Sequence, residues 1–491
     1  MSNYKFSKSS FLKGIQCEKQ LYLYKHHYDW QDPISESQQA IFDRGTNVGL
    51  LARDLFPNGI DVSPESYRKF YEASLNTTQQ IEDGAEILYE PSFIYNEVLV
   101  ALDILVKENG EWKAFEVKSS TSIKNVNILD ASVQYYVIKN SGIDLNDISI
   151  VYLNNQYIKQ GDLELDQLFN KDSVLDKVLE QQNFIEKKIE RFKNLIKEKD
   201  IPDIDIGPHC DDPYICSFHG HCWDHIPDYS VFNISRLKAD QKFDLYKQGI
   251  INIEDLPNDY SLSESQRMQV DCHNNNETII DKPAIRDFLS SLNYPLYFMD
   301  FETFMPAVPL YDDSRPYQQI PFQYSLHYQE DHHRELEHFE FLGEPHNDPR
   351  ILFIENLLRD TESEGVLLVY NQSFEATRLK EIARDFPQYA NDIEERLSRI
   401  KDLMIPFQKK YYYVPEMQGF YSLKYVLPAI VPNNNYEGMP ISDGGEAMIA
   451  FESLLNESDK NVIDTTRKNL LEYCKMDTMA MVEILNRLLN I

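Results

Sequence analysis

Glycine, cysteine and basic residues are all in short supply in this sequence. Glycine contributes only 17 of the 491 residues, which excludes collagen-like and low-complexity proteins. Every apolar run is shorter than the ~18 residues that a membrane-spanning helix needs, and residues 1–5 lack the apolar segment of a secretion signal. Six cysteines are too few for a disulfide scaffold. We therefore expect a cytoplasmic protein with no membrane partner, in which clustered cysteines indicate metal binding.

The charge balance is strongly acidic, with 80 Asp and Glu against 48 Lys and Arg and a formal net charge of -32. A protein that coats nucleic acid usually has a basic surface, so the composition argues against that class. A nuclease is compatible with this charge, because its metal sites are themselves clusters of carboxylates. A hydrophobic share of 42% provides for packed cores, and at ~150 residues per domain the length has room for about three domains.

Three blocks follow one another along the chain, and their patterns indicate an α/β protein. Residues 1–230 mix helical and strand patterns, 231–285 form a polar helical connector, and from 286 to 491 strand patterns alternate with helical ones. The connector contains a helical segment, a Gly-Ile turn and a second short helical segment. This order is typical of a helix-hairpin-helix, which binds phosphate through its turn amides. A plain helical connector is the alternative.

A hairpin in the first block brings three charged residues together. Asn109-Gly110 is a strong turn signal between a predicted strand at 97–106 and another at 112–118. With that turn, Asp103 lies opposite Glu116, and Lys118 lies on the same face as Glu116. Two opposed carboxylates repel each other unless a cation lies between them, and a divalent metal would serve. A solvated surface ion pair is the alternative interpretation. The opposite face of the strand at 97–106 is apolar throughout, and we expect it to be core.

These residues resemble the core of the PD-(D/E)XK nucleases. Asp103 followed by Glu116-Val117-Lys118 matches the Asp…(Asp/Glu)-x-Lys pattern. The helical segment 130–136 resembles the Gln-Tyr motif of the RecB-like branch. The resemblance implies a restriction-endonuclease-like domain in which Gln134 and Tyr135 contact the substrate or support the site.

The segment 44–49 resembles the first helical motif of the same branch, with one departure. Gly49 stands where many relatives have a metal-binding histidine. Glu90 or Glu97 could replace that upstream ligand.

Four cysteines suggest a second metal site. Cys210, Cys216 and Cys222 are separated by two equal gaps of five residues, and Cys17 lies far upstream. Four thiolates are the usual ligands of a four-iron cluster or a structural zinc, and histidines at 209, 219, 221 and 225 could replace one thiolate in favour of zinc. Unrelated cysteines in a polar loop are the alternative. The remaining thiols, at 272 and 474, have no partner in the sequence.

This cysteine arrangement resembles the iron–sulphur clasp of the CRISPR-associated and AddB-type RecB-like nucleases. Their clustered cysteines commonly begin Cys-x2-Cys, whereas the spacing here is Cys-x5-Cys. The resemblance implies a 4Fe-4S cluster, with zinc as the alternative, that closes a loop of roughly 200 residues.

Acidic residues recur in the third block. Asp300 and Glu302 lie on one face of an apolar strand at 296–303. A second apolar strand at 366–370 leads to Glu375, and a final helix places Tyr473 and Asp477 one turn apart. Burying two acids on one strand is costly without a metal. The alternative is a Rossmann-like domain with incidental acids.

The same residues resemble the tyrosine subtype of the DEDD exonucleases, which have an RNase H-like fold. Asp300 and Glu302 match the first motif, and Tyr473 with Asp477 matches the third. The second motif is matched at Asn371 and Phe374, but Glu375 replaces its aspartate, and Asp402 is a substitute acid. The resemblance implies hydrolysis from the 3′ end by two ions, Mg²⁺ or Mn²⁺, held by these four acids, with Tyr473 orienting the water.

Between these motifs, basic and aromatic residues gather in one stretch of sequence. Lys401, Lys409, Lys410 and the tyrosines at 411–413 could hold a nucleic-acid strand by charge and stacking. A strand edge with solvated lysines is an equal alternative.

Nearly the whole chain resembles an uncharacterised bacterial family that fuses a RecB-like nuclease to an exonuclease-like domain, and the segments 423–428 and 442–447 belong to this match. We therefore predict a metal-dependent nuclease with two sites, acting on DNA with single-stranded ends. The alternatives are a nucleic-acid-binding or scaffolding protein with one or both sites degenerate, and an RNA exonuclease. The sequence has no nucleotide-binding phosphate loop, so an ATP-driven motor such as a helicase would be a partner.

Overall fold

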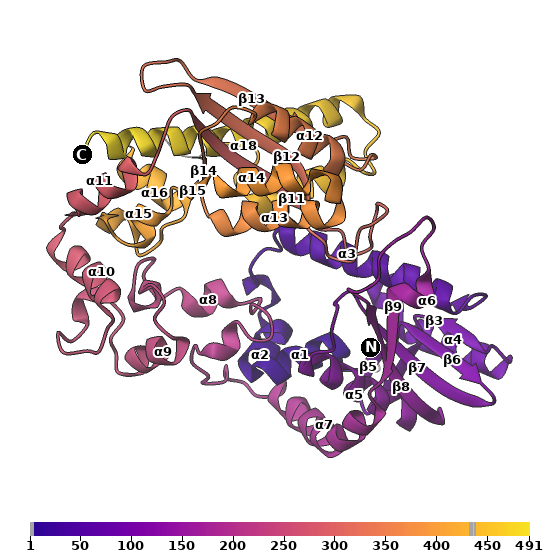
Figure 1. Ribbon diagram of the computed structural model, residues 1–491. Helices are drawn as coiled ribbons and strands as arrows, with labels where there is room; N and C mark the ends of the chain where they lie inside the picture. The colour runs from indigo at the N-terminus through magenta and orange to yellow at the C-terminus, as the bar shows by residue number, and fades with distance from the viewer. Residues whose placement is uncertain (1–3, 432–435, 437) are drawn as a thin grey trace. The chain divides into compact units, whose positions relative to one another are not determined.

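Mixed sheets and helices build two units in the computed structural model of this chain (Figure 1). The structure describes residues 4–431, 436 and 438–491, so residues 1–3, on which the expectation of no secretion signal partly rests, lie outside it. The first unit contains Met1–His225 together with Pro306–Tyr317, and the second contains Ile226–Met305 and Gln318–Ile491. The fold is therefore mixed α/β, and the residues of the predicted connector at 231–285 belong to the second unit.

Two sheets form the frame of the first unit, with strand orders β2-β3-β6-β7-β8-β9 and β1-β5-β4. The strands are β1 (Phe6–Ser7), β2 (Ile60–Asp61), β3 (Ile87–Tyr89), β4 (Ser92–Tyr95), β5 (Val98–Ala101), β6 (Ile104–Glu108), β7 (Glu111–Lys118), β8 (Leu145–Leu153) and β9 (Phe169–Ser173). The helices are α1 (Lys8–Gln16), α2 (Glu18–His26), α3 (Glu36–Ala52), α4 (Phe70–Glu82), α5 (Asn125–Asn140), α6 (Leu165–Leu168), α7 (Leu175–Leu195) and α8 (His219–Trp223).

The predicted hairpin is confirmed, and its register runs from Ile104 opposite Phe115 to Glu108 opposite Glu111. The long strand predicted at 97–106 is wrong, because the chain breaks at Leu102 and Asp103 into β5 and β6, which belong to different sheets. The break also divides the predicted apolar face. Val98, Val100 and Leu102 join one hydrophobic cluster, whereas Ile104 and Val106 join another.

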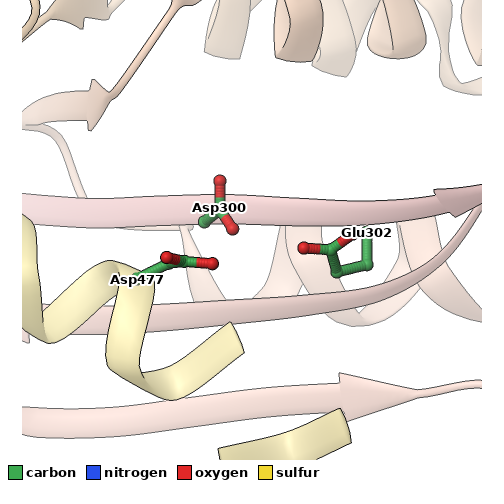
Figure 2. Close-up of side chains that lie close together, drawn as sticks. All are labelled: Asp300, Glu302 and Asp477. Atoms are coloured by element: carbon green, nitrogen blue, oxygen red, sulfur yellow. The ribbon is translucent and has the colours of Figure 1, made fainter. Parts of the chain in front are cut away.

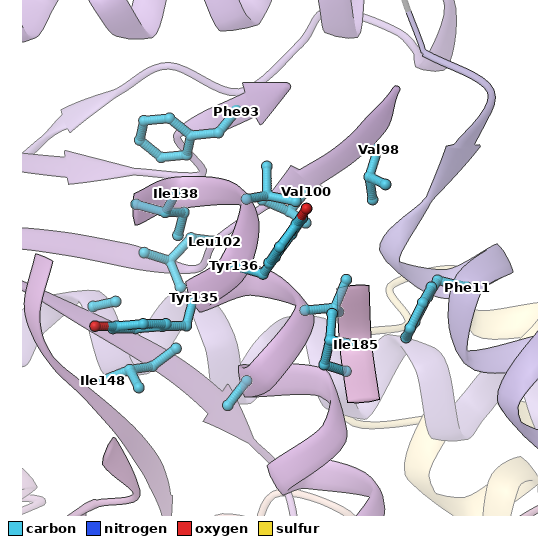
Figure 3. Packing of buried hydrophobic residues seen from close by; sticks show 14 of the residues in the cluster. Phe11, Phe93, Val98, Val100, Leu102, Tyr135, Tyr136, Ile138, Ile148 and Ile185 are labelled. Atoms are coloured by element: carbon cyan, nitrogen blue, oxygen red, sulfur yellow. The ribbon is translucent and has the colours of Figure 1, made fainter. Parts of the chain in front are cut away.

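A crossover helix positions the charged residues of the first unit. β7 and β8 are parallel, and α5 connects them, as a parallel pair requires. Apolar residues of α1, α5 and α7 cover one face of the sheet in a single cluster (Figure 3). The side chains of β7 that face this cluster therefore meet α5 and α1 rather than open solvent.

One five-stranded sheet forms the centre of the second unit, in the order β13-β12-β11-β14-β15. The strands are β10 (Ile279–Ile280), β11 (Leu296–Phe304), β12 (Ile320–Gln329), β13 (Glu337–Leu342), β14 (Val366–Val369), β15 (Ile400–Asp402) and β16 (Tyr412–Tyr413). The helices are α9 (Ala239–Lys247), α10 (Glu264–Asn275), α11 (Lys282–Ser290), α12 (Arg350–Asp360), α13 (Gln372–Asp385), α14 (Ala390–Ser398), α15 (Ile405–Gln408), α16 (Leu423–Ile430), α17 (Gly444–Ser453) and α18 (Lys460–Leu489).

The two faces of this sheet are covered by different helices. β12 is antiparallel to β11 and to β13, whereas β14 is parallel to β11 and β15 to β14. Tyr297, Met299 and Phe301 of β11 pack in one cluster with apolar residues of α12, α13 and α14. The alternate residues of β11, which include Asp300 and Glu302, face the side where α17 and α18 pack.

The connector does not form the predicted helix-hairpin-helix. α9 is followed by a left-handed turn at Gly249, but the second element is only a short 3₁₀ helix at Ile253–Asp255. The turn amides of Gly249 and Ile250 donate to the carbonyls of Tyr246 and Leu245. Because these amides already cap α9, they are not free to bind phosphate.

A short segment from the C-terminal half of the chain belongs to the first unit. Within Pro306–Tyr317, Ala307 is buried in the cluster that contains Phe115 and Val117. The hydroxyl of Tyr317 donates to the carbonyl oxygen of Ser119, and Asp312 forms an ion pair with Lys159 at 2.8 Å.

Among the helices of the described residues, none combines the length and the apolar character needed to cross a membrane.

Candidate functional site

Three acids converge on one face of the sheet in the second unit. Asp300 and Glu302 project from β11 and Asp477 from α18, and ligating oxygens of the three lie within 4.8 Å of one another (Figure 2). Glu302 and Asp477 are buried, with exposed fractions of 7% and 6%. Residues separated by nearly 180 positions in the sequence thus form one cluster of carboxylates that could hold a metal ion.

A polar network fixes the position of α18 over the sheet. Thr478, next to Asp477, bonds through its hydroxyl to Ser325 Oγ and to His327 Nδ1, both at 2.8 Å. Ser325 stands directly opposite Asp300 in the β11–β12 ladder. The amide of Gln323 donates to the carbonyl of Leu470 at 2.8 Å. These buried bonds hold the helix in the register that turns Asp477 toward Asp300.

Two tyrosines bind the carboxylate of Asp477. The hydroxyl of Tyr436 donates to Asp477 Oδ1 at 2.5 Å, and Tyr473 forms a second hydrogen bond to Asp477. Burial, together with the charge of Asp477, raises the pKa of both phenols far above the ordinary range. Both therefore stay neutral hydroxyl donors. Tyr436 was not identified from the sequence, because it lies between the matched segments 423–428 and 442–447 and belongs to neither.

The electrostatics of the acid cluster favour a cation. Burial raises the pKa of Asp300 and of Glu302 well above the usual range, and repulsion from Asp477 raises both further. The pKa of Asp477 rises only to about 6, because its bonds from Tyr436 and Tyr473 oppose the effect of burial. A divalent ion would remove this repulsion and favour the ionised forms.

Glu375 lies close to the cluster but outside the group of three. It is 1% exposed on α13, and its charge acts on both Asp300 and Glu302. Its Oε2 atom is buried with no hydrogen-bond partner among the described residues. The substitute acid, Asp402, has a structural contact of its own, because its two oxygens accept the backbone N–H groups of Asn371, Gln372 and Met404. It caps α13.

The buried carboxyl of Glu375 should make stability depend on pH. Burial raises its pKa from 4.5 to about 8, so the folded chain binds this proton more tightly than the unfolded chain. In metal-free buffer, its contribution to the free energy of unfolding is full below about pH 4.5 and is lost as the pH rises through about 8. We expect the free energy of unfolding of the wild type to fall by on the order of 4 kcal/mol over this range, and that of Glu375→Gln not to fall.

Urea unfolding with a chelator between pH 5 and 9 would measure this effect. Glu394→Gln, at an exposed position of α14, is the matched control and should retain the wild-type pH dependence. Identical pH profiles for wild type and Glu375→Gln would contradict the prediction.

Two segments known only from the family resemblance also border the acids. Lys424 on α16 is exposed, and its positive charge lowers the pKa of both Glu302 and Asp477 against the effect of their burial. α17 begins beside Glu302, since a Cβ added at Gly444 would lie 3.4 Å from Glu302 Oε2. The segments 423–428 and 442–447 therefore form part of the wall of this site.

A second charged cluster lies on β7 and α5 in the first unit. Glu116 is 2% exposed, and its Oε1 atom accepts hydrogen bonds from Lys118 and Lys8, both at 2.7 Å. Its Oε2 atom accepts one from Gln134 at 2.7 Å. Asp130, one turn before Gln134 on α5, contacts the ammonium groups of Lys118 at 2.6 Å and Lys8 at 3.3 Å. The structure thus brings Glu116, Lys118 and Gln134 together and adds Lys8 and Asp130.

Asp103 stands beside Glu116, and the pKa values of the two carboxyls are shifted in opposite directions. Its Oδ2 atom accepts the backbone N–H of Val117 at 2.5 Å. Burial raises the pKa of Asp103 well above its usual range, and the charge of Glu116 adds to this. Burial acts in the same direction on Glu116, but Lys118 and Lys8 lower the pKa of Glu116 far below the ordinary value. Neighbouring acids with pKa values pushed apart are typical of catalytic sites.

The remaining residues predicted for this site lie in different environments. Tyr135 is 8% exposed in the apolar core (Figure 3), which fits a supporting role rather than contact with substrate. Gly49 lies on α3. Glu90 is the nearer of the two substitute acids, because its backbone N–H donates to the Asp103 carbonyl at 3.0 Å. Glu97 instead pairs with Lys5 at 2.6 Å.

The four predicted cysteines meet in one cavity of the first unit. Its lining contains Cys17, Cys210, Cys216 and Cys222, together with Lys19, Gln20, Asp205, the histidines at 209 and 219, and four apolar side chains. Burial raises the pKa of the Cys216 thiol to about 12, and the other three thiols contribute to this rise. The amide of Gln16 donates to the carbonyls of His209 and Tyr214, which joins α1 to the cysteine loop. Four thiols held together in this way would need a bound cation to ionise.

The basic and aromatic stretch is exposed only in part. Lys401 and Lys409 are exposed, whereas Lys410 is 4% exposed and its ammonium lies 4.1 Å from the ring of Tyr413, which is 0% exposed. Tyr412 is also buried. Cys474 is a free, buried thiol, as predicted, and its Sγ atom lies 3.9 Å from Asp300 Oδ2.

Comparisons with known proteins give relatives but no activity. A family model described as a domain of unknown function, DUF2779, matches residues 297–422. The chain is similar to the uncharacterized protein UU173 of Ureaplasma parvum serovar 3, with 26% identity over 237 residues, 43% of this chain and 34% of that protein. It is also similar to the uncharacterized protein MG366 of Mycoplasma genitalium, with 27% identity over 206 residues, 38% of this chain and 31% of that protein. The chain spans about a third of the length of the curated relatives it matches.

Proposed function

We propose that this protein is a metal-dependent nuclease that hydrolyses phosphodiester bonds, with DNA as its expected substrate and one site in each unit. The observation that carries the proposal is the convergence of Asp300, Glu302 and Asp477 within 4.8 Å. Three largely buried acids, with pKa values raised by burial and mutual repulsion, form a ligand set suited to Mg²⁺ or Mn²⁺.

In the second unit, each side chain has a role suited to a 3′–5′ exonuclease. Asp300, Glu302 and Asp477 would hold the metal, and Glu375 could reach a second ion from the edge of the cluster. Bound divalent ions would supply polarisation of the phosphodiester and a lower pKa for water. The neutral hydroxyl of Tyr473 can donate to an oxygen of the reacting group, while Tyr436 keeps Asp477 in place. The sheet order, with the acids on the central strand and an antiparallel second strand, supports an RNase H-like assignment.

In the first unit, the arrangement supports a PD-(D/E)XK site. Asp103 and Glu116 would hold a metal ion, with Glu90 as a further acid beside Asp103. Lys118 provides an ammonium group beside Glu116 for the phosphate or the attacking water, and Gln134 fixes the orientation of the Glu116 carboxylate.

The cysteine cavity would tie the first unit together through a 4Fe-4S cluster. One zinc ion with Zn–S bonds of ~2.3 Å would bring its thiolates to about 3.8 Å from each other. Four cysteines that line one cavity suit a 4Fe-4S cluster or a zinc ion, and the iron and zinc content of the wild type distinguishes the two.

Cleavage of end-labelled strands tests the proposal. The full chain with MnCl₂ should degrade single-stranded DNA, and the double variant Lys118→Met/Asp300→Asn should lose this activity. Lys118→Met alone should lower the rate of cleavage at the site of the first unit by about 100-fold or more. An RNA strand of the same sequence serves as the second substrate, and preference for it would indicate an RNA exonuclease. No cleavage of either strand by the wild type would overturn the proposal.

A second candidate function, a nucleic-acid-binding protein with a degenerate N-terminal site, is favoured by one observation. Both oxygens of Glu116 already accept hydrogen bonds from Lys8, Lys118 and Gln134. Binding of DNA without turnover, unaffected by a chelator, would support this function instead.

A further inference from the structure

Two lysines and two acids alternate in a closed ring at the N-terminal site. Lys8 and Lys118 each contact both Glu116 and Asp130, at distances of 2.6 to 3.3 Å. Lys118 comes from β7, whereas Lys8 is the first residue of α1, more than 100 positions earlier. The two ammonium groups therefore occupy equivalent positions on either side of the same pair of carboxylates.

Lys8 is not needed to complete the hydrogen bonds of the two acids, although its charge helps to keep Glu116 ionised. Gln134 Nε2 already donates to Glu116 Oε2 at 2.7 Å and to Asp130 Oδ1 at 3.1 Å. Lys118 supplies a donor to the remaining oxygen of each acid, at 2.7 and 2.6 Å. Lys8 is thus a second cation on oxygens that already have a donor, and bringing an ammonium group out of water has a substantial cost.

The position of Lys8 in its helix is also unfavourable for a structural cation. It occupies the first turn of α1, where the helix dipole favours acids and disfavours a positive charge by about 0.3–1 kcal/mol. A surface acid at this position would stabilise the helix. The lysine is therefore better explained by a negative group that approaches the site than by the stability of α1.

Both ammonium groups retain the capacity to bind such a group. An ammonium has three N–H donors, and each lysine directs two of them to Glu116 and Asp130, so that one is left over among the contacts of the described residues. The side chains of Lys8 and Lys118 are 22% and 23% exposed, whereas that of Glu116 is 2% exposed. Both lysine side chains are therefore partly open to solvent, whereas the carboxylate between them is closed off.

We propose that Lys8 is a second phosphate-binding lysine of the N-terminal site, and that its free N–H and that of Lys118 together hold non-bridging oxygens of the scissile phosphodiester. This inference rests on the proposed nuclease function of the same site. The ring of Glu116 and Asp130 keeps the two ammonium groups at a fixed separation before the substrate arrives, so little ordering remains for the binding step.

Substitutions at Lys8 in the full chain test this role, in an Asp300→Asn background so that the first unit alone would cleave. The variants are Lys8→Met and Lys8→Arg. Lys5→Met is the matched control, because Lys5 lies three residues earlier and pairs with exposed Glu97 at 2.6 Å. Binding of fluorescein-labelled single-stranded DNA is measured by anisotropy in CaCl₂ over a series of NaCl concentrations, and kcat and KM are measured in MnCl₂.

We expect Lys8→Met to weaken binding about 10-fold and to make the slope of log affinity against log salt shallower by about 0.7, the value for one lost phosphate contact on a single strand. The ratio kcat/KM should fall about 100-fold. Lys8→Arg should keep the wild-type salt slope, and Lys5→Met should match the wild type in every measurement.

An unchanged salt slope and kcat/KM in Lys8→Met, with Lys118→Met inactive, would overturn the inference while leaving the nuclease proposal intact. Lys8 would be structural if Lys8→Met had a lower urea midpoint but an unchanged salt slope, while Lys8→Arg bound and cleaved DNA normally. That result would also overturn the inference. If the Asp300→Asn background fails to cleave DNA, the catalytic proposal for this site fails, and the salt slope still decides whether Lys8 binds phosphate.

Discussion

Replacing Asp300 with asparagine should abolish nearly all hydrolysis at the C-terminal site. The substitution keeps the shape of the side chain but removes a charged ligand from a group of acids within 4.8 Å of one another. Loss of charge at a metal centre weakens both ion binding and stabilisation of the reacting phosphate, so we expect a decrease of about 100-fold or more in the release of nucleotides. Turnover should be measured on 3′-labelled single strands in a Lys118→Met background.

In the absence of metal, the same substitution should stabilise the folded protein. Asp300 contributes repulsion to a buried cluster, and its neutral replacement relieves this, so Asp300→Asn should unfold at higher urea than the wild type in a chelator. Asp464→Asn, at an exposed position on α18, is the control for both measurements. Full activity of Asp300→Asn would show that the acid cluster is not the hydrolytic centre.

Replacing Cys216 with alanine should release the metal and destabilise the first unit. Cys17 and Cys222, at the two ends of the clasp, are separated by about 200 residues, and the chain-entropy model assigns about 5 kcal/mol to closing a loop of that length. Iron and zinc per chain should be measured by mass spectrometry and the free energy of unfolding in urea. We expect iron in the wild type and almost none in the variant.

Cys272→Ala is the matched control for this prediction. Cys272 is 3% exposed on α10 in the second unit and does not line the cysteine cavity. Its replacement should leave the metal content unchanged. Zinc rather than iron in the wild type would keep the clasp but reject the cluster, and a metal content of zero in protein purified without oxygen would reject the clasp itself.

Local sequence patterns were sufficient for the parts of each site that lie on one element or one hairpin. The Asn109-Gly110 turn fixes the register of β6 and β7, so the position of Asp103 beside Glu116 follows from counting residues. The period of a strand places Asp300 and Glu302 on one face, and helical spacing does the same for Tyr473 and Asp477. A similar argument could have found Asp130, which is four residues before Gln134 on α5.

The parts that could not be predicted depend on contacts between distant segments. Lys8 reaches Glu116 across 108 positions, and Tyr436 reaches Asp477 across 41, and neither residue lies in a pattern that indicates its partner. The break between β5 and β6 could not be predicted either, because every second residue from Val98 to Val106 is apolar. Each half of that run is buried, but against a different cluster, and alternation alone carries no information on which core a strand meets.

The burial of Lys410, Tyr412 and Tyr413 was missed for a related reason, whereas Lys401 and Lys409 of the same stretch are exposed. The composition of this stretch is typical of a solvated, basic surface. Tyr413, however, pairs with Ile279 in a two-stranded sheet, and Lys410 covers the ring of Tyr413. Burial lowers the pKa of Lys410 to about 8, so the long side chain acts mainly as packing at the strand.

Pro306–Tyr317 lies in the C-terminal half of the sequence but belongs to the first unit, and this limits how the protein can be divided into fragments. Glu302 on β11 is followed, after only a few residues, by a segment whose Ala307 and Val308 complete the hydrophobic cluster around Phe115. A gene truncated after His225 would encode a first half with a gap in its interior, and the complementary fragment would carry an orphaned apolar loop. Neither half should be recovered intact after a single proteolytic cut near residue 225, and the activity of each site is better isolated by point substitution than by shortening the polypeptide.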